Sequence, residues 1–254
     1  EQIELSLGAQ RAVVVEVGGG LRTYSVDGRD VLDGYAADAM CTSGRGQVLL
    51  PWPNRLQDGA YEFGGRHHQL ALTEPTNGNA IHGLVRWDSW RAAEREPHRV
   101  VMEHTLHPQP GYPFTLALAI AYALSDDGLR VTTTATNAGR EACPYGSGMH
   151  PYLTVGTETV DPVVLRVPAH SVLRSDERSL PTGSMPVAGT DYDFREPRAI
   201  GATVLDNAFT GLERDDDGLA RVELRAPDGT ARALWVDDTY THVMVFSGDP
   251  LPDV

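Results

Sequence analysis

The sequence contains no lysine, so all 21 basic residues are arginines, against 35 acidic residues and a net charge of −14. Nucleic-acid binding needs clustered basic side chains that displace counterions from phosphates, and a polybasic membrane surface has the same need. No apolar run approaches the ~18 residues of a membrane-spanning helix. We therefore expect no nucleic-acid partner and no membrane, and a soluble protein of the cytoplasm.

Cysteine is almost as scarce, and the two residues present, Cys41 and Cys143, cannot form a disulfide framework. We expect both to be reduced thiols, as in cytosolic proteins. The chain begins at Glu1 with no signal-peptide pattern, so we expect a few residues to precede it in the natural, unsecreted protein.

Glycine and proline are plentiful, with 26 and 17 residues, and they separate short segments with a period of two. Leu129–Thr136 alternates between apolar and polar residues. The apolar run Phe114–Leu124 has helix-forming composition, but Asp126-Asp127-Gly128 joins it to that alternating segment and predicts a β-hairpin. Asp-Gly turns recur at 27–28 and 228–229. This pattern excludes an all-helical protein and predicts a large antiparallel β-sandwich or barrel.

The chain shows no internal repeat, no low-complexity segment and no sustained helical periodicity. Residues 171–200 are rich in proline, glycine and charge, which predicts long loops. Apolar strands resume on both sides of this segment, so it does not look like a linker. We therefore expect one domain over residues 1–254.

Several well-known catalytic motifs are absent. There is no Walker A loop and no His-Glu-x-x-His, and Gly146-Ser147-Gly148 is not a nucleophile elbow. His67 and His68 are neighbours on a predicted strand, so their side chains point to opposite faces and cannot chelate one metal ion. We expect no metal site.

Four scattered polar segments remain as candidates for chemistry. Asn54-Arg55 follows Trp52 in a proline-stiffened turn and would present a guanidinium fork and an amide to a polyhydroxyl ligand. His82 precedes a glycine, His150 precedes a proline, and Asp206 follows the end of an apolar strand. Each also has an ordinary structural interpretation, such as a surface arginine or a packed histidine.

Taken in this order, the four segments resemble the aldose 1-epimerase (galactose mutarotase) family, and the resemblance covers essentially the whole chain. Leu84 stands where many members have a second glycine, a departure that bears on sugar specificity. The matching motifs are Asn54-Arg55, Ile81-His82-Gly83, Gly148-Met149-His150-Pro151-Tyr152 and Leu205-Asp206, with support from Gly111-Tyr112-Pro113, Thr136-Asn137-Ala138-Gly139 and Asp193-Phe194-Arg195.

The resemblance implies a galactose-mutarotase-like supersandwich that interconverts the α and β anomers of an aldohexose without a cofactor. His150 would be the catalytic acid. Substrate-binding residues would be Asn54, Arg55, His82 (which also assists catalysis) and Asp206. Trp52 is either a platform for the sugar or a core residue.

The family's catalytic base is a glutamate after the final strands, and Glu213 and Glu223 do not match its context. We expect that glutamate beyond Val254.

Two other functions stay open at this point. One is a mutarotase for a hexose 6-phosphate, which needs additional arginine side chains near C6 of the sugar. The other is a non-catalytic monosaccharide-binding protein that keeps the pocket without the acid–base pair. The sequence does not distinguish a monomer from a homodimer, and the same sandwich hosts other carbohydrate activities.

Mutarotation moves only protons, and the sequence shows no metal-ligand spacing, so activity should not depend on a metal ion. We expect the same rate with and without EDTA, measured by polarimetry on a freshly dissolved aldose. Loss of activity on chelation, restored by a divalent cation, would contradict this prediction.

Overall fold

The computed structural model describes residues 1–249 and 251, and in this part of the chain all regular secondary structure is β. Within the same residues, no helix has the length and apolarity needed to cross a membrane. The chain forms two compact units, Glu1–Leu153 and Thr154–Val254. The single domain expected over residues 1–254 stays a prediction.

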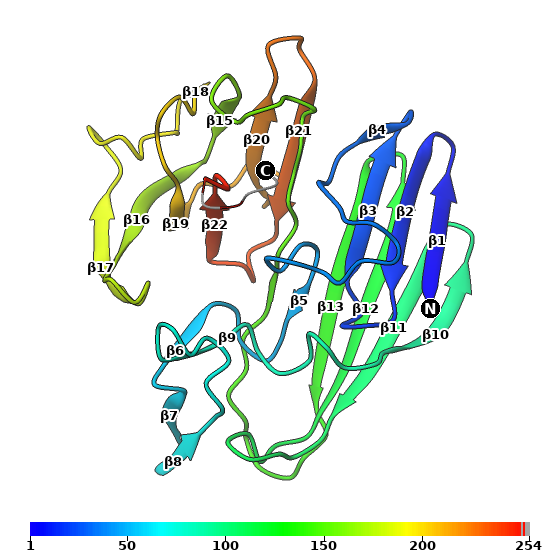
Figure 1. Ribbon diagram of the computed structural model, residues 1–254, viewed down its shortest axis with the longest axis vertical. Coiled ribbons are helices and arrows are strands. Elements are labelled where there is room, and N and C mark those ends of the chain that lie inside the picture. The colour runs from blue at the N-terminus through cyan, green and yellow to red at the C-terminus, as the bar shows by residue number, and fades with distance from the viewer. Residues whose placement is uncertain (250, 252–254) are drawn as a thin grey trace. The chain divides into compact units, whose positions relative to one another are not determined.

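The first unit is built on two four-stranded antiparallel sheets (Figure 1). Three short strand pairs complete it, in the orders β14-β5, β6-β9 and β7-β8. The first sheet contains β1 (Gln2–Leu7), β2 (Gln10–Val15), β3 (Leu21–Val26) and β4 (Arg29–Asp30), and the second contains β10 (Arg91–Glu96), β11 (Arg99–Leu106), β12 (Leu116–Ser125) and β13 (Gly128–Asn137). The short strands are β5 (Val48–Leu49), β6 (Arg55–Gln57), β7 (Ala60–Phe63), β8 (Arg66–Gln69), β9 (Asn79–Ile81) and β14 (Gly148–Met149).

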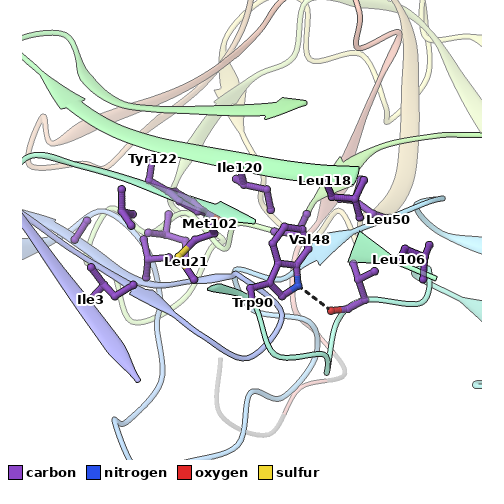
Figure 2. Packing of buried hydrophobic residues seen from close by; sticks show 14 of the residues in the cluster. Ile3, Leu21, Val48, Leu50, Trp90, Met102, Leu106, Leu118, Ile120 and Tyr122 are labelled. Carbon is purple, nitrogen blue, oxygen red and sulfur yellow. Dashed lines mark hydrogen bonds between the residues drawn. The ribbon is translucent and has the colours of Figure 1, made fainter. Parts of the chain in front are cut away.

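The core of this unit lies between its two large sheets, and β12 supplies much of it. Alternate residues of β12, including Leu118, Ile120 and Tyr122, are buried, while the alanines between them face outward opposite the threonines of β13. The Tyr122 hydroxyl donates a 2.7 Å hydrogen bond to the Gly19 carbonyl, which satisfies its buried oxygen. Figure 2 shows this packing around Trp90, whose indole N–H donates to the Val85 carbonyl.

The second unit contains two further four-stranded antiparallel sheets, with strand orders β18-β15-β20-β21 and β17-β16-β19-β22. Its own core includes Leu165, Phe194, Leu205 and Phe209, all almost fully buried. The strands are β15 (Val164–Arg166), β16 (Ala169–Ser175), β17 (Pro181–Pro186), β18 (Arg198–Ala199), β19 (Asp206–Leu212), β20 (Ala220–Arg225), β21 (Ala231–Val236) and β22 (His242–Phe246).

The three hairpins predicted at Asp-Gly turns are confirmed as β3–β4, β12–β13 and β20–β21. The prediction of loops over residues 171–200 is wrong in part, because most of β16 and all of β17 and β18 lie there. Prolines occupy the two ends of β17, and β17 is an edge strand. An edge strand can lack backbone donors on its free side, so its proline content misled the prediction.

Ile120→Ala should lower the free energy of unfolding by about 2–5 kcal/mol, because it leaves a cavity in the core between the sheets. Thr134→Ala, on the exposed face of the neighbouring strand, is the matched control and should change it by less than about 0.5 kcal/mol. Urea unfolding measures both. Equal effects would contradict the assignment of the core face.

Candidate active site

The pairing of β6 with β9 brings Asn54 and His82 together. Arg55 lies opposite Ile81 in the antiparallel register, so the residues just outside the ladder also face each other. The Asn54 backbone N–H donates to His82 Nδ1 at 3.1 Å, and the His82 backbone N–H donates to the Asn54 carbonyl at 2.9 Å. Both residues have left-handed φ angles, +57° and +62°. Such angles are uncommon for non-glycine residues and recur at functional sites.

His82 is neutral at physiological pH. Burial lowers its pKa to about 3, and repulsion from the nearby His150 and Arg86 adds to the effect. Because Nδ1 accepts the Asn54 N–H, the single ring proton resides on Nε2. His82 can therefore donate a hydrogen bond from Nε2 to a ligand oxygen but is too weakly basic to serve as a charged acid.

Gly83 allows the backbone after His82 to approach the segment before Asn54. Its φ is +74°, and a Cβ atom there would lie 1.9 Å from the Leu50 carbonyl oxygen. The next residue, Leu84, donates its N–H to that same carbonyl at 2.7 Å. A side chain at position 83 would push these two segments apart and displace His82.

His150 follows β14, whose pairing with β5 fixes its backbone. Its N–H donates to the Gln47 carbonyl at 3.0 Å, and its own carbonyl accepts the Gly46 N–H at 2.8 Å. The imidazole meets the His82 ring edge to face, with centroids 5.5 Å apart. A Cβ on Gly44 would lie 3.2 Å from the ring of His150, so Gly44 leaves it room.

Tyr152 also contacts the imidazole of His150. The two rings stack at 14° with centroids 5.2 Å apart. The Tyr152 hydroxyl donates to the Ser43 carbonyl at 3.0 Å, and the guanidinium of Arg45 lies 5.0 Å from its ring centroid. Arg45 is almost fully buried and pairs with Asp33 at 2.9 Å. This stack restricts the rotation of the His150 ring.

Arg55 is held by Glu74, a residue that the sequence did not single out. Arg55 Nε and Nη2 each lie 2.9 Å from the Glu74 carboxylate, which also accepts the Asn79 side-chain amide at 3.0 Å. Burial raises the pKa of Glu74, but the hydrogen bonds from Arg55 and Asn79 outweigh it and lower the pKa overall. Arg55 Nη1 donates to Asn54 Oδ1 at 3.2 Å. Glu74 therefore orients Arg55 and remains ionised.

The two remaining predicted residues have different surroundings. Trp52 is half-buried and packs on the apolar core of the first unit, and its indole N–H is buried without a hydrogen-bond partner among the described residues. Its role as a sugar platform stays a prediction. Asp206 is exposed at the start of β19 in the second unit. Its approach to the two histidines also stays a prediction.

The first unit thus brings together His82, His150, Asn54 and Arg55, which are up to 96 residues apart in the sequence. Sequence reasoning missed Glu74, which lies in a turn-rich segment with no recognisable motif. Two hollows on the second unit contain none of the predicted catalytic or substrate-binding residues. Within the described residues, no three His, Cys, Asp or Glu side chains lie close enough to hold a metal ion.

Comparison with known proteins identifies the family. The sequence profile described as aldose 1-epimerase matches residues 1–253. This chain belongs to the aldose 1-epimerase family. It is therefore an isomerase, and the resemblance drawn from its motifs is confirmed.

The chain is also similar to individual proteins. It is 36% identical to the uncharacterized protein YihR of Escherichia coli K12, over 82% of this chain and 68% of that protein. It is 26% identical to maltose epimerase of Levilactobacillus brevis, over 82% of this chain and 65% of the enzyme. The chain thus spans about two thirds of the length of these relatives.

A solved structure, that of the GalM/aldose epimerase homologue from C. elegans, superposes with a TM-score of 0.83 at 17% identity. The superposition covers 97% of this chain and 81% of that one, and it confirms the predicted β-sandwich fold class.

The environment of His82 generates a prediction about its protonation. Its pKa is about 3 in the folded chain and 6.5 ordinarily, so between these values the unfolded chain binds a proton that the folded chain does not. The free energy of unfolding should therefore fall as the pH drops from about 6.5 towards 3. We expect ¹⁵N NMR at pH 5 to show His82 neutral with its proton on Nε2.

The His82→Asn variant identifies the His82 signal, because only that signal disappears. A His82 ring that titrates near pH 6.5 would contradict the prediction.

Proposed function

We propose that this protein interconverts the α and β anomers of an aldose by opening and reclosing the hemiacetal ring. The observation that carries the proposal is the pair of imidazoles in edge-to-face contact, 5.5 Å apart, with one of them held neutral. Two equivalent histidines would compete for one proton. Here the two environments differ, which favours separate roles: His150 as the acid and His82 as a neutral hydrogen-bond donor.

His150 donates its proton to the ring oxygen as the C1–O5 bond breaks. A base removes the proton of the C1 hydroxyl at the same time, and the product is the open-chain aldehyde. Rotation about C1–C2 presents the other carbonyl face, and the two proton transfers then run in reverse. An imidazole suits this exchange because its ordinary pKa is near neutrality. Membership of an epimerase family supports the assignment of this reaction.

His82 and Arg55 bind sugar hydroxyls and orient the ring oxygen towards His150. His82 offers its Nε2 proton, and Arg55 offers the guanidinium hydrogens that Glu74 and Asn54 leave unused. A neutral donor suits a neutral hydroxyl, because no charge has to be desolvated when the sugar binds. Asn54 fixes both residues, and Asp206 would bind hydroxyls at the far edge of the sugar.

The second proton transfer needs a base, and the resemblance to the family implies a glutamate. The glutamates that the structure describes near the site or near the last strands have other partners. Glu74 is engaged by Arg55 and Asn79, Glu213 lies 2.9 Å from His170, and Glu223 lies 3.3 Å from Arg166. A base must reach the C1 hydroxyl within about 2.6–3.2 Å or through one water molecule.

Polarimetry on freshly dissolved α-D-glucose and α-D-galactose tests the proposal. The natural full-length protein should accelerate the approach to equilibrium for at least one aldose. If it binds sugars without accelerating mutarotation of any of them, it is a sugar-binding protein and the proposal is wrong.

His150→Ala should lower the catalysed rate by about 10²- to 10⁴-fold, the usual contribution of a general acid–base group. The fold should survive, because the ring lies at a partly exposed position outside the core. His67→Ala, an exposed histidine on β8, is the matched control and should leave the rate unchanged. A near-normal rate for His150→Ala would make this residue a structural one.

A further inference from the structure

Three arginines of the first unit lie near the histidine pair: Arg55 and Arg86 act on His82, and Arg45 contacts the Tyr152 ring that stacks on His150. Two of them have carboxylate partners. Arg45 pairs with Asp33 at 2.9 Å, and Arg55 pairs with Glu74. The third, Arg86, donates from Nη1 to the neutral side-chain oxygen of Gln47 at 3.2 Å. Among the described residues, no carboxylate lies within ion-pair distance of Arg86. Its positive charge is therefore uncompensated.

Arg86 is nevertheless connected to the two histidines by hydrogen bonds and by the chain. Gln47 links it to His150, because the Gln47 main-chain carbonyl accepts the His150 N–H and its side chain accepts Arg86. Arg86 also follows His82 closely in the chain, and Gly83 between them lies against the Leu50 carbonyl. Both attachments place the guanidinium beside the candidate site.

A half-buried cation with only an amide partner carries a desolvation cost that a bound anion would offset. The nearby thiol of Cys41 does not neutralise it, because burial raises the pKa of that thiol to about 11. The Trp87 ring lies 5.9 Å from the guanidinium and supplies no formal charge. The guanidinium has five donors, and the structure uses one of them for Gln47.

We propose that Arg86 binds an anionic oxygen-bearing substituent of the sugar, so that the preferred substrate is an acidic aldose and not a neutral one. Guanidinium forks bind phosphate, sulfate and carboxylate oxygens in pairs, and each of these groups supplies the missing negative charge. The net charge of −14 opposes the approach of anions at long range, so the selectivity would arise at the site itself. This inference deepens the proposed function and rests on it.

The test compares four probes by polarimetry and by equilibrium binding: glucose, glucose 6-phosphate, glucose 6-sulfate and glucuronate. The wild-type protein should bind and turn over at least one acidic probe at least tenfold better than glucose. The best acidic probe identifies the substituent, because the phosphate, sulfate and carboxylate differ in charge and shape. No preference for any acidic probe over glucose overturns the inference.

The decisive variant is Arg86→Gln, which keeps the length and one amide donor but removes the charge. It should reduce kcat/KM for the best acidic probe about 10- to 100-fold more than for glucose, the range expected for a lost charged hydrogen bond. Arg91→Gln, an exposed arginine paired with Glu103, is the matched control and should change neither. Equal losses on acidic and neutral sugars would mean that Arg86 is only structural, and would overturn the inference.

The binding measurement separates this inference from the proposed function. If no sugar is epimerised but an acidic probe binds and Arg86→Gln weakens that binding, the anion site stands and the catalytic proposal fails. If glucose is epimerised and no acidic probe binds more tightly, the catalytic proposal stands and the anion site is wrong.

Discussion

The candidate site depends on one constraint, the pairing of Asn54 with His82 across the ends of β6 and β9. The Asn54 N–H occupies His82 Nδ1, so the imidazole has one possible neutral form, with its proton on Nε2. Burial and the surrounding positive charge keep it in that form. The same pairing requires left-handed backbone at both residues and a glycine at position 83. The Asn54 hydrogen bond thus fixes the tautomer and the donor direction of the ring, and burial with the nearby positive charge keeps the ring neutral.

The balance of charge around the two histidines also depends on a small number of contacts. A strongly acidic chain uses two of its carboxylates, Asp33 and Glu74, to neutralise Arg45 and Arg55, which lie near or in the site. Bidentate pairing gives an arginine a fixed orientation as well as a counter-charge, as Glu74 does for Arg55. Arg86 has a neutral partner instead, which makes it the member of this group with charge available for a ligand.

The family and much of the fold could be predicted from the sequence, because their signals are local. Asp-Gly turns and a period of two identify hairpins such as β12–β13 without knowledge of distant residues. The prediction failed over residues 171–200, where β17 is an edge strand with proline at both ends. Edge position is a property of the sheet and has no signature in the segment itself.

What the sequence alone determined is the all-β class and the family, and it singled out Asn54, Arg55, His82 and His150, which the first unit brings together. What only the tertiary structure decided is which partners the polar residues have and whether they carry charge. Glu74 became a partner of Arg55, His82 became neutral, and Arg86 was left without a carboxylate among the described residues. The physical reason is that burial and charge depend on neighbours brought together by folding, such as His150 beside His82, and such contacts have no local pattern in the chain.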